Sequence, residues 1–351
     1  MILYLFFIGL VSLLFVVEYF YKEEGYSYLT VFSILVIILF VVFRHEVGYD
    51  YLNYISYFNS SVSSLIERKI ELGFVGLVAI LKFLGANYFW LFFIIGIAII
   101  AFLFHGIKLY TQNVRIALLI YLLIPGLFLN SLSIIRQSLA IVILFNAYYL
   151  FFSKRYLYCF FLIGLGVLFH YSSLLIIPFF FLATKLENRA RVLLLTGLPL
   201  SLLLAKLNIL NVILTAVLGN SKFGVYIGAS DETNFIKLLV LNVSVIPYLF
   251  FYERLDKLNR TLLILVIFGL ILFNVFANVT AISRITYYFK VFEVVLLANL
   301  VSFFKRGWSQ AIVCICIFIY FFVMFYASLS YDYSSVVEYP KMTPYKTIFS
   351  Q

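Results

Sequence analysis

The sequence predicts an all-α polytopic membrane protein of about 12 transmembrane or re-entrant helices with short loops. Of its 351 residues, 65% are hydrophobic and 11% are charged, whereas a soluble domain is nearer half apolar and a quarter charged. The apolar residues form continuous runs instead of the alternation typical of a membrane β-barrel. We therefore expect one integral-membrane domain, 1–351, whose largest loops are 44–71 and 207–234.

Candidate helices follow one another along the whole chain, because a span needs roughly 20 apolar residues and fewer where the bilayer is thin. The N-terminal run lacks a basic start and a small-residue cleavage site, so we interpret it as the first span. The run 156–184 is too long for one helix, and we expect two short helices that enter and return, with His170 near the turn. The candidate runs are about 2–20, 28–43, 72–85, 88–107, 115–130, 133–152, 156–184, 192–206, 235–252, 261–280, 286–304 and 309–328.

The net charge of +10 is spread among the spans, which argues against nucleic acid as a partner and favours contact with anionic lipid. Because Lys and Arg favour cytoplasmic loops, five basic loops are placed in the cytoplasm: 108–115, 153–155, 185–191, 253–260 and 305–306. The opposite side then holds Arg136, the His170 turn, Arg284, the 207–234 loop and the tail 331–351. The side of the Arg44–Asp50 loop stays open, because it depends on how many of the runs between 72 and 130 cross.

The first polar cluster, 43–54, follows a predicted span directly. Gly48 permits a tight turn, after which Tyr51, Tyr54 and Phe58 fall on one helical face. Arg44 is a candidate phosphate ligand, and Asp50 is a candidate base or a residue that orders Arg44. An interfacial loop with a snorkelling Arg and a tyrosine belt explains the spacing equally well.

The second cluster is Arg136-Gln137, preceded by Asn130 and Ser133. A guanidinium is planar, permanently charged and matched to phosphate oxygens. An Arg that begins a helix at the membrane edge is an equally good structural explanation, but the polar residues before it favour a lined cavity.

The third cluster is His170-Tyr171-Ser172-Ser173. A neutral His in a membrane turn is a candidate general base, although a lone His more often satisfies a nearby carbonyl. Ionisable groups at bilayer depth are costly and usually serve a function, so His170 stays a catalytic candidate.

The fourth cluster contains Arg284 and Tyr287, three residues apart and positioned to grip one anion, or else an interfacial Arg with an aromatic belt. Lys290 and Glu293 share the same spacing and can pair on a helix.

Several signatures of soluble enzymes are absent from the sequence: a Gly-rich phosphate loop, His-Glu-x-x-His, Cys-x-x-Cys and Gly-x-Ser-x-Gly. Asp231-Glu232 is a weak candidate for a divalent cation, and we predict no metal and no cofactor. Cys159, Cys314 and Cys316 all lie in apolar runs and are expected to be buried packing residues.

Taken in order, these clusters resemble motifs of the EpsG family, bacterial polysaccharide polymerases similar to Wzy-type O-antigen polymerases. The segment 43–54 fits Phe-Arg-x-x-Val-Gly-x-Asp-Tyr-x-x-Tyr. The later motifs resemble Arg136-Gln137-x-x-Ala140, Phe169-His170-x-Ser172 and Arg284-x-x-Tyr287-Tyr288-Phe289. The resemblance covers about residues 28–300, and 192–280 carries no matching motif.

The resemblance implies a GT-C-like polymerase architecture in the bacterial cytoplasmic (inner) membrane. The implied reaction moves a growing glycan from undecaprenyl diphosphate to the terminal sugar of a lipid-linked repeat unit on the outer face. Arg136, with Gln137, Arg284, Tyr287 or Arg44, would bind the diphosphate, and His170 or, second, Asp50 would be the base. A chain-length regulator and a flippase are the partners implied by the resemblance.

Three other functions compete with this interpretation. A flippase for lipid-linked sugars also needs cations in a membrane cavity, but flippases tend to carry internal repeats and none is evident here. An O-antigen ligase differs only in its acceptor. A lipid-linked monosaccharide transferase commonly has an acidic first outer loop, where Glu23-Glu24 is the only pair.

Overall fold

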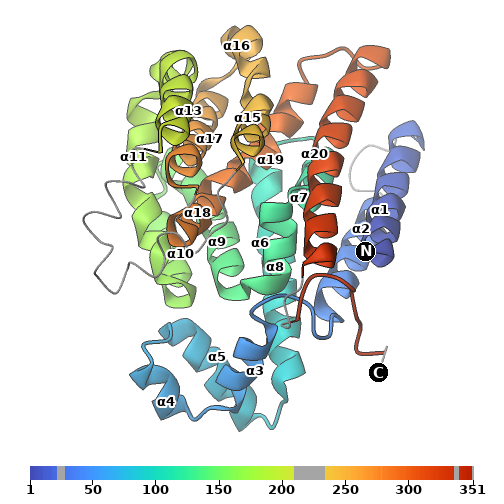
Figure 1. Ribbon diagram of the computed structural model, residues 1–351, viewed down its shortest axis with the longest axis vertical. Coiled ribbons are helices and arrows are strands. Elements are labelled where there is room, and N and C mark those ends of the chain that lie inside the picture. The colour runs from blue at the N-terminus through green and yellow to red at the C-terminus, as the bar shows by residue number, and fades with distance from the viewer. Residues whose placement is uncertain (22–27, 209–233, 278, 336–339, 350–351) are drawn as a thin grey trace. The chain divides into compact units, whose positions relative to one another are not determined.

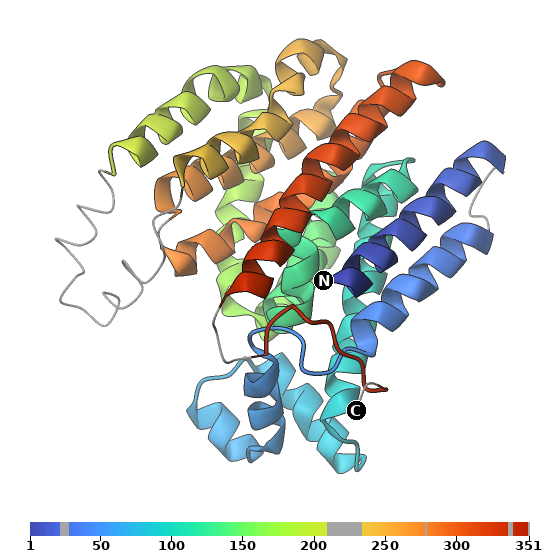
Figure 2. The ribbon, with the colours of Figure 1, turned by 45° about the vertical axis from the view of Figure 1, so that its right-hand side comes forward.

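The computed structural model describes residues 1–21, 28–208, 234–277, 279–335 and 340–349 (Figures 1 and 2). The regular elements of these residues are all helices, without strands, and one isolated antiparallel bridge joins Arg44 to Thr347. The predicted all-α class is therefore confirmed. The candidate acidic pairs Glu23-Glu24 and Asp231-Glu232, and most of the 207–234 loop, lie outside the described residues.

Packing divides the chain into two compact units, Met1–Ser173 with Leu297–Gln351, and Leu174–Leu296. The expectation of one membrane domain stays a prediction. The first unit contains α1 (Ile2–Tyr21), α2 (Tyr28–Val42), α3 (Tyr51–Asn59), α4 (Val62–Glu67), α5 (Leu72–Phe83), α6 (Tyr88–Tyr110), α7 (Val114–Leu123), α8 (Pro125–Ser133), α9 (Ile135–Phe152), α10 (Tyr156–Phe169) and α20 (Trp308–Ser334). The second contains α11 (Ile177–Lys185), α12 (Ala190–Val192), α13 (Leu198–Lys206), α15 (Phe235–Asn242), α16 (Pro247–Phe251), α17 (Lys257–Phe276) and α18 (Thr280–Ile285), and α19 (Tyr287–Val301) runs from the second unit into the first.

Six of the described helices are long and apolar enough to cross a membrane, or up to seven if the pair α7 and α8, bent by 70°, counts as one span. Further apolar helices of 10–17 residues accompany them. These segments make the chain a membrane protein, while the count of about 12 and the GT-C-like architecture stay predictions. The break expected at His170 is confirmed, because α10 ends at Phe169 and His170 has extended backbone (φ −158°, ψ 115°).

The loop 43–50, which follows α2, packs against the turn between α8 and α9. A Cβ on Gly48 would lie 2.4 Å from the carbonyl oxygen of Leu132 and 2.9 Å from Cα of Ser133. Gly48 also has φ +105°, a conformation that side chains rarely adopt. Glycine is thus required here, and the contact brings the loop to the end of α9 that carries Arg136.

The contact of Gly48 with Leu132 shows at which end of the first unit the Arg44–Asp50 loop lies, which the sequence leaves open. The 12-residue α5 is not among the helices long enough to cross, and with α3 and α4 it forms a layer beyond the ends of α9 and α10 (Figures 1 and 2). The Arg44–Asp50 loop therefore lies at the same end of the first unit as Arg136, which we call the site end.

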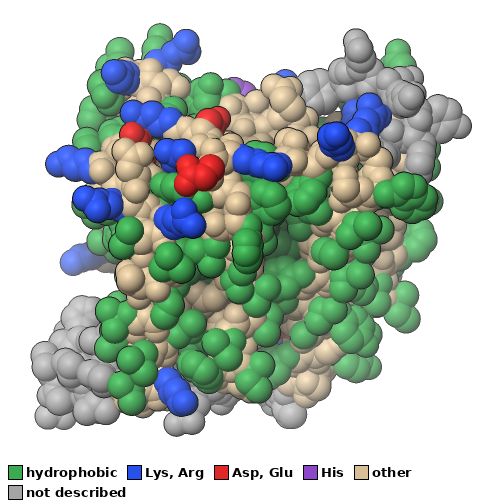
Figure 3. Space-filling model, turned by 90° about the horizontal axis from the view of Figure 1, so that it is seen from above, with side chains coloured by type: hydrophobic (Ala, Val, Ile, Leu, Met, Phe, Trp, Pro, Cys, Tyr) green, Lys and Arg blue, Asp and Glu red, His purple; other side chains and the backbone are tan. Residues whose placement is uncertain are grey.

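The opposite end of the first unit is basic. Exposed Lys and Arg side chains lie where α6 and α9 end and where α10 and α20 begin: Lys108, Lys154, Arg155, Lys305 and Arg306. Figure 3, a view from above, shows Lys and Arg side chains in blue on the face turned to the viewer. By the positive-inside rule, this end is expected in the cytoplasm.

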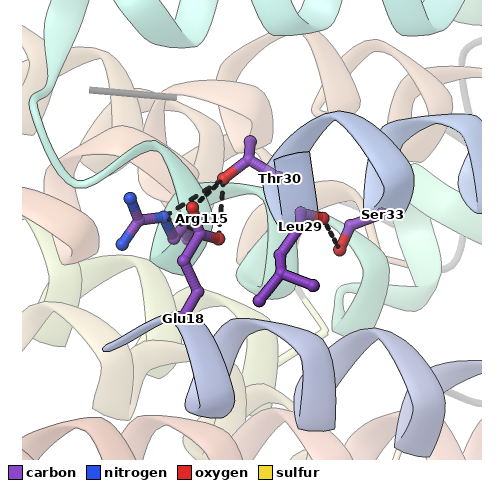
Figure 4. A network of polar contacts seen from close by, with 5 residues as sticks. All are labelled: Glu18, Leu29, Thr30, Ser33 and Arg115. Carbon is purple, nitrogen blue, oxygen red and sulfur yellow. Dashed lines mark hydrogen bonds and ion pairs between the residues drawn. The ribbon is translucent and has the colours of Figure 1, made fainter. Parts of the chain in front are cut away.

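A buried carboxylate joins three helices at the basic end (Figure 4). Glu18 of α1 pairs with Nε of Arg115 of α7 at 3.0 Å and accepts a 2.7 Å hydrogen bond from the Thr30 hydroxyl of α2. Because an unpaired buried carboxylate is costly, these partners fix how α1, α2 and α7 pack.

The second unit has its own polar core. Asn274 of α17 donates to the hydroxyl of Ser201 of α13 at 2.8 Å, and Asn242 of α15 donates to Asn274 at 2.9 Å. Such side chains commonly bind membrane helices to one another. The predicted pairing of Lys290 with Glu293 is confirmed, with a Nζ–Oε2 distance of 2.6 Å.

Two sequence expectations need correction. Cys159 is buried and Cys314 is partly buried, but Cys316 is exposed, because only 17% of the apolar window of α20 is packed inside the structure. The tail expected from Tyr331 begins later, since α20 continues to Ser334.

We predict that Gly48→Ala destabilises the protein. The added methyl group clashes with the backbone of Leu132 and forces a left-handed conformation that costs on the order of 1–3 kcal/mol. Thermal unfolding of the purified protein in detergent should show a lower Tm. The control is Gly76→Ala, because a Cβ added at Gly76 would meet no neighbouring atom within 4 Å and Ala favours a helix over Gly. An equal Tm for the two variants would contradict this account.

Candidate functional site

Three ionisable side chains from three elements meet at the site end. The Glu71 carboxylate accepts a hydrogen bond from Arg136 Nη1 at one oxygen and lies 2.9 Å from His170 Nδ1 at the other. Arg136 and His170 were predicted from the sequence as separate candidates, and the structure brings them together through Glu71.

Local backbone geometry places each of these groups. Glu71 is the N-cap of α5 but its side chain makes no capping hydrogen bond, so the carboxylate is left to bind elsewhere. Arg136 lies in the first turn of α9, after a helix break at Ile134 (φ −93°, ψ 61°). His170 ends α10, and close packing of Gly73 against Leu168 holds α5 beside that end: a Cβ on Gly73 would lie 2.7 Å from the Leu168 carbonyl oxygen.

Aromatic rings surround the Arg136 guanidinium. Its central carbon lies 5.2 Å from the ring centre of Phe74, 5.4 Å from that of Tyr57 and 5.7 Å from that of Tyr54. Each distance is within the range of a cation–π interaction, which stabilises a partly desolvated cation. The prediction that Tyr51, Tyr54 and Phe58 share one face of a helix is confirmed, and in α3 this face is buried. Tyr54 on that face is one of the rings around Arg136.

The carboxylate of Glu71 is held in its charged form. Burial opposes ionisation, but the hydrogen bond with His170 and the charge of Arg136 outweigh it, so the pKa of Glu71 lies below its ordinary value. The side chains are 8% exposed for Glu71, 16% for Arg136 and 28% for His170. The anion is thus enclosed, while the imidazole keeps an exposed edge.

The contact with Glu71 determines which nitrogen of His170 can act as a base. An ionised carboxylate only accepts hydrogen bonds, so the Nδ1 atom beside it must carry the proton. In the neutral imidazole the lone pair then resides on Nε2. A neutral His170 oriented in this way can take a proton through Nε2 while Glu71 stabilises the cation that forms.

The other predicted site residues lie elsewhere or are enclosed. Asp50, the N-cap of α3, accepts a 3.3 Å hydrogen bond from Asn53, and Gln137 is buried beside Arg136. Arg44 is 1% exposed and does not reach the surface in this structure. Arg284, which is exposed, and Tyr287 belong to the second unit, where a turn at Thr286 separates α18 from α19. Their roles in binding stay predictions.

Glu71 is the residue that sequence reasoning missed, because it stands just before the short apolar run 72–85 and outside the polar clusters. A signal for it exists in the sequence. No Asp or Glu occurs between Leu72 and Leu186, so an acidic partner for Arg136 or His170 had to come from outside that stretch. Glu71 is the acidic residue immediately before it.

The amino-acid sequence also identifies the family of this chain. A model of the EpsG family matches residues 27–347, which is most of the chain. The chain belongs to the EpsG family. This is a family of exopolysaccharide and O-antigen polymerase-like proteins. Comparisons with curated proteins and with solved structures gave no match.

In this EpsG-family chain, the family match spans the whole candidate site. Glu71, Arg136 and His170 all lie within residues 27–347. Family membership supports a polysaccharide polymerase-like role and glycosyltransferase chemistry at the family level.

We predict that Glu71 stabilises the fold in a pH-dependent way. Because its pKa is lowered in the folded protein, its contribution is complete above the ordinary Glu pKa of about 4.3 and is lost as the pH falls through the lower folded-state value. Glu71→Gln should lower the Tm at about pH 5, and the Tm difference from the parent should shrink in stronger acid.

The matched control for this measurement is Glu67→Gln, because Glu67 is exposed on α4. The Tm of Glu67→Gln should equal that of the parent at every pH. A Tm difference between parent and Glu71→Gln that persists unchanged down to about pH 2 would contradict the assignment.

Proposed function

We propose that this chain is a bacterial surface polysaccharide polymerase. It transfers a growing glycan from undecaprenyl diphosphate to the terminal sugar of a lipid-linked repeat unit, on the outer face of the cytoplasmic membrane. The observation that carries the proposal is the Glu71 carboxylate, which joins a cation, Arg136, to a candidate base, His170, at the site end.

Arg136 would neutralise the leaving group. As the bond between the anomeric carbon and the phosphate oxygen breaks, negative charge builds on the diphosphate, and a preorganised cation stabilises that charge. One guanidinium N–H binds Glu71, and a guanidinium has five N–H donors in a fork that matches phosphate oxygens. Arg136 also hydrogen-bonds the Tyr54 hydroxyl, and the donors not used by Glu71 and Tyr54 would bind the diphosphate.

His170 would activate the acceptor. Its Nε2 takes the proton of the acceptor hydroxyl as the new glycosidic bond forms, and Glu71 stabilises the resulting imidazolium. The donor carries its own diphosphate leaving group, so the step balances with these groups: the glycan moves to the acceptor oxygen, the proton moves to His170 and undecaprenyl diphosphate departs.

The distribution of basic residues supports the outer-face location of the site. The basic residues of the first unit gather at the end opposite the site, where α6 and α9 end. The positive-inside rule puts that end in the cytoplasm and the site outside. Apolar and aromatic side chains on the spans would then contact bilayer lipid and the prenyl chains of both substrates. A chain-length regulator and a flippase are the partners that this function would require.

We predict that Arg136→Ala and His170→Gln abolish polymer formation. Loss of a cation that stabilises the transition state typically costs about 10²–10³-fold in rate, and loss of a general base about 10²–10⁴-fold. The measurement is the gel profile of surface polysaccharide in a host deleted for this gene and complemented with each variant. The matched control is Arg155→Ala at the basic end.

The form of the remaining glycan separates the competing functions. Collapse of the ladder to a single repeat on the acceptor supports the polymerase. Long polymer left on undecaprenyl diphosphate would identify a ligase, and unflipped repeats on the inner leaflet would identify a flippase. A parental ladder in Arg136→Ala at equal protein level would refute the proposed role of Arg136.

A further inference from the structure

A second arginine of the first unit, Arg44, is buried and forms no ion pair with an acidic side chain among the described residues. Arg44 is 1% exposed, and its Nη1 donates to the Val41 carbonyl oxygen at 2.5 Å. Its Nε and Nη2 atoms are buried and have no hydrogen-bond partner among the described residues. The guanidinium carbon lies 5.0 Å from the ring centre of Phe92.

Burying a guanidinium without enough hydrogen-bond partners costs free energy. Burial lowers the pKa of Arg44 to about 10, so the side chain is still charged at neutral pH. A buried charge normally needs a counter-ion and a full set of hydrogen bonds. The unused N–H groups therefore mark a place where an anion would be stabilised.

The residues Lys341–Ile348, which we call the strap, pair with the backbone at this arginine, and Tyr345 of the strap acts electrostatically on its guanidinium. The backbone of the strap pairs with the loop after α2: His45 donates to the Lys346 carbonyl at 2.9 Å, and Ile348 donates to the Phe43 carbonyl at 3.1 Å. These bonds flank the antiparallel bridge between Arg44 and Thr347.

Asp332, near the end of α20, anchors the strap. Its carboxylate accepts hydrogen bonds from the Thr343 backbone at 2.7 Å, from the Thr343 hydroxyl and from the Tyr49 hydroxyl, the last two at 2.5 Å each. Tyr345 of the strap stacks on Phe40 with ring centres 4.1 Å apart. One carboxylate thus holds both the strap and the loop with which the strap pairs.

The outer contacts of the strap are of a kind that breaks easily. Lys346 pairs with Glu46 at 2.7 Å, but the two side chains are 49% and 44% exposed, and such surface ion pairs contribute little stability. The two backbone hydrogen bonds that make up the bridge complete the pairing with residues 43–45. Tyr54 of α3 relates Arg44 to the candidate site, because it acts electrostatically on Arg44 and its ring centre lies 5.7 Å from the guanidinium carbon of Arg136.

We propose that the strap Lys341–Ile348 is a lid over a second anion-binding subsite at Arg44, which opens to admit the phosphate groups of a lipid-linked substrate. The subsite and its lid stand on the contacts above, whereas the identity of the ligand as a lipid diphosphate rests on the proposed polymerase function.

A reversible cross-link tests the lid without altering Arg44. His45→Cys with Lys346→Cys places two thiols on residues that oppose each other, because the His45 N–H donates to the Lys346 carbonyl at 2.9 Å. Directly opposed residues of an antiparallel pair have Cα atoms about 5.5 Å apart, within the reach of a disulfide. The native cysteines, Cys159, Cys314 and Cys316, are replaced by Ala. Arg136→Ala is added so that binding at that residue does not obscure binding at Arg44.

The experiment measures the binding of inorganic pyrophosphate to the purified protein by isothermal titration calorimetry. The reduced protein should bind pyrophosphate, the oxidised protein should lose that binding, and a reductant should restore it. The single variant His45→Cys, treated identically, should bind pyrophosphate both before and after oxidation. Equal binding by the oxidised and reduced forms overturns the lid, and lack of binding by the reduced form overturns the subsite.

A second variant ties the binding to Arg44. Arg44→Gln in the reduced protein should lose pyrophosphate binding while the cross-link still forms on oxidation, which reports a folded strap. Retained binding would overturn the assignment to Arg44. Failure of the polymerase proposal looks different: the ladder would persist in Arg136→Ala while the cross-link still controlled pyrophosphate binding.

Discussion

The structure of the site end depends on one carboxylate. Glu71 bridges Arg136 and His170, and it does so among aromatic rings where an unpaired charge would be costly. Without it, Arg136 would lack a counter-ion and His170 would lack the acceptor that fixes its tautomer. The three residues come from α5, α9 and the end of α10, so the same contact that prepares the chemistry also holds these elements in place.

A second constraint acts through backbone packing. Gly48 allows the loop 43–50 to rest on the turn between α8 and α9, and Gly73 allows α5 to rest on the end of α10. Both contacts bring polar segments to the same end of the first unit. The site is therefore built where helices end or break, which is where a membrane protein can expose polar groups without placing unsatisfied backbone in lipid.

The sequence was sufficient to predict the all-α membrane class and the importance of Arg136 and His170. Long apolar runs report the class directly, and an Arg or a His inside such a run is conspicuous. Glu71 could not be found in the same way, because a Glu beside a short apolar run is unremarkable until the chain folds it against Arg136. Similarly, nothing in the local pattern around Arg44 indicates that its backbone pairs with residues 346–348, about 300 positions later in the chain. The end that the Arg44–Asp50 loop occupies became clear only from the contact of Gly48 with Leu132.

The most direct test of the account is the surface polysaccharide profile of a host whose only copy of this gene carries Glu71→Gln, with Glu67→Gln as the matched control. The substitution keeps the shape of the side chain but removes the charge that pairs with Arg136 and orients His170. The account predicts that the ladder collapses to a single repeat in Glu71→Gln and stays parental in Glu67→Gln. A parental ladder in Glu71→Gln, at the same protein level in the membrane, would contradict it.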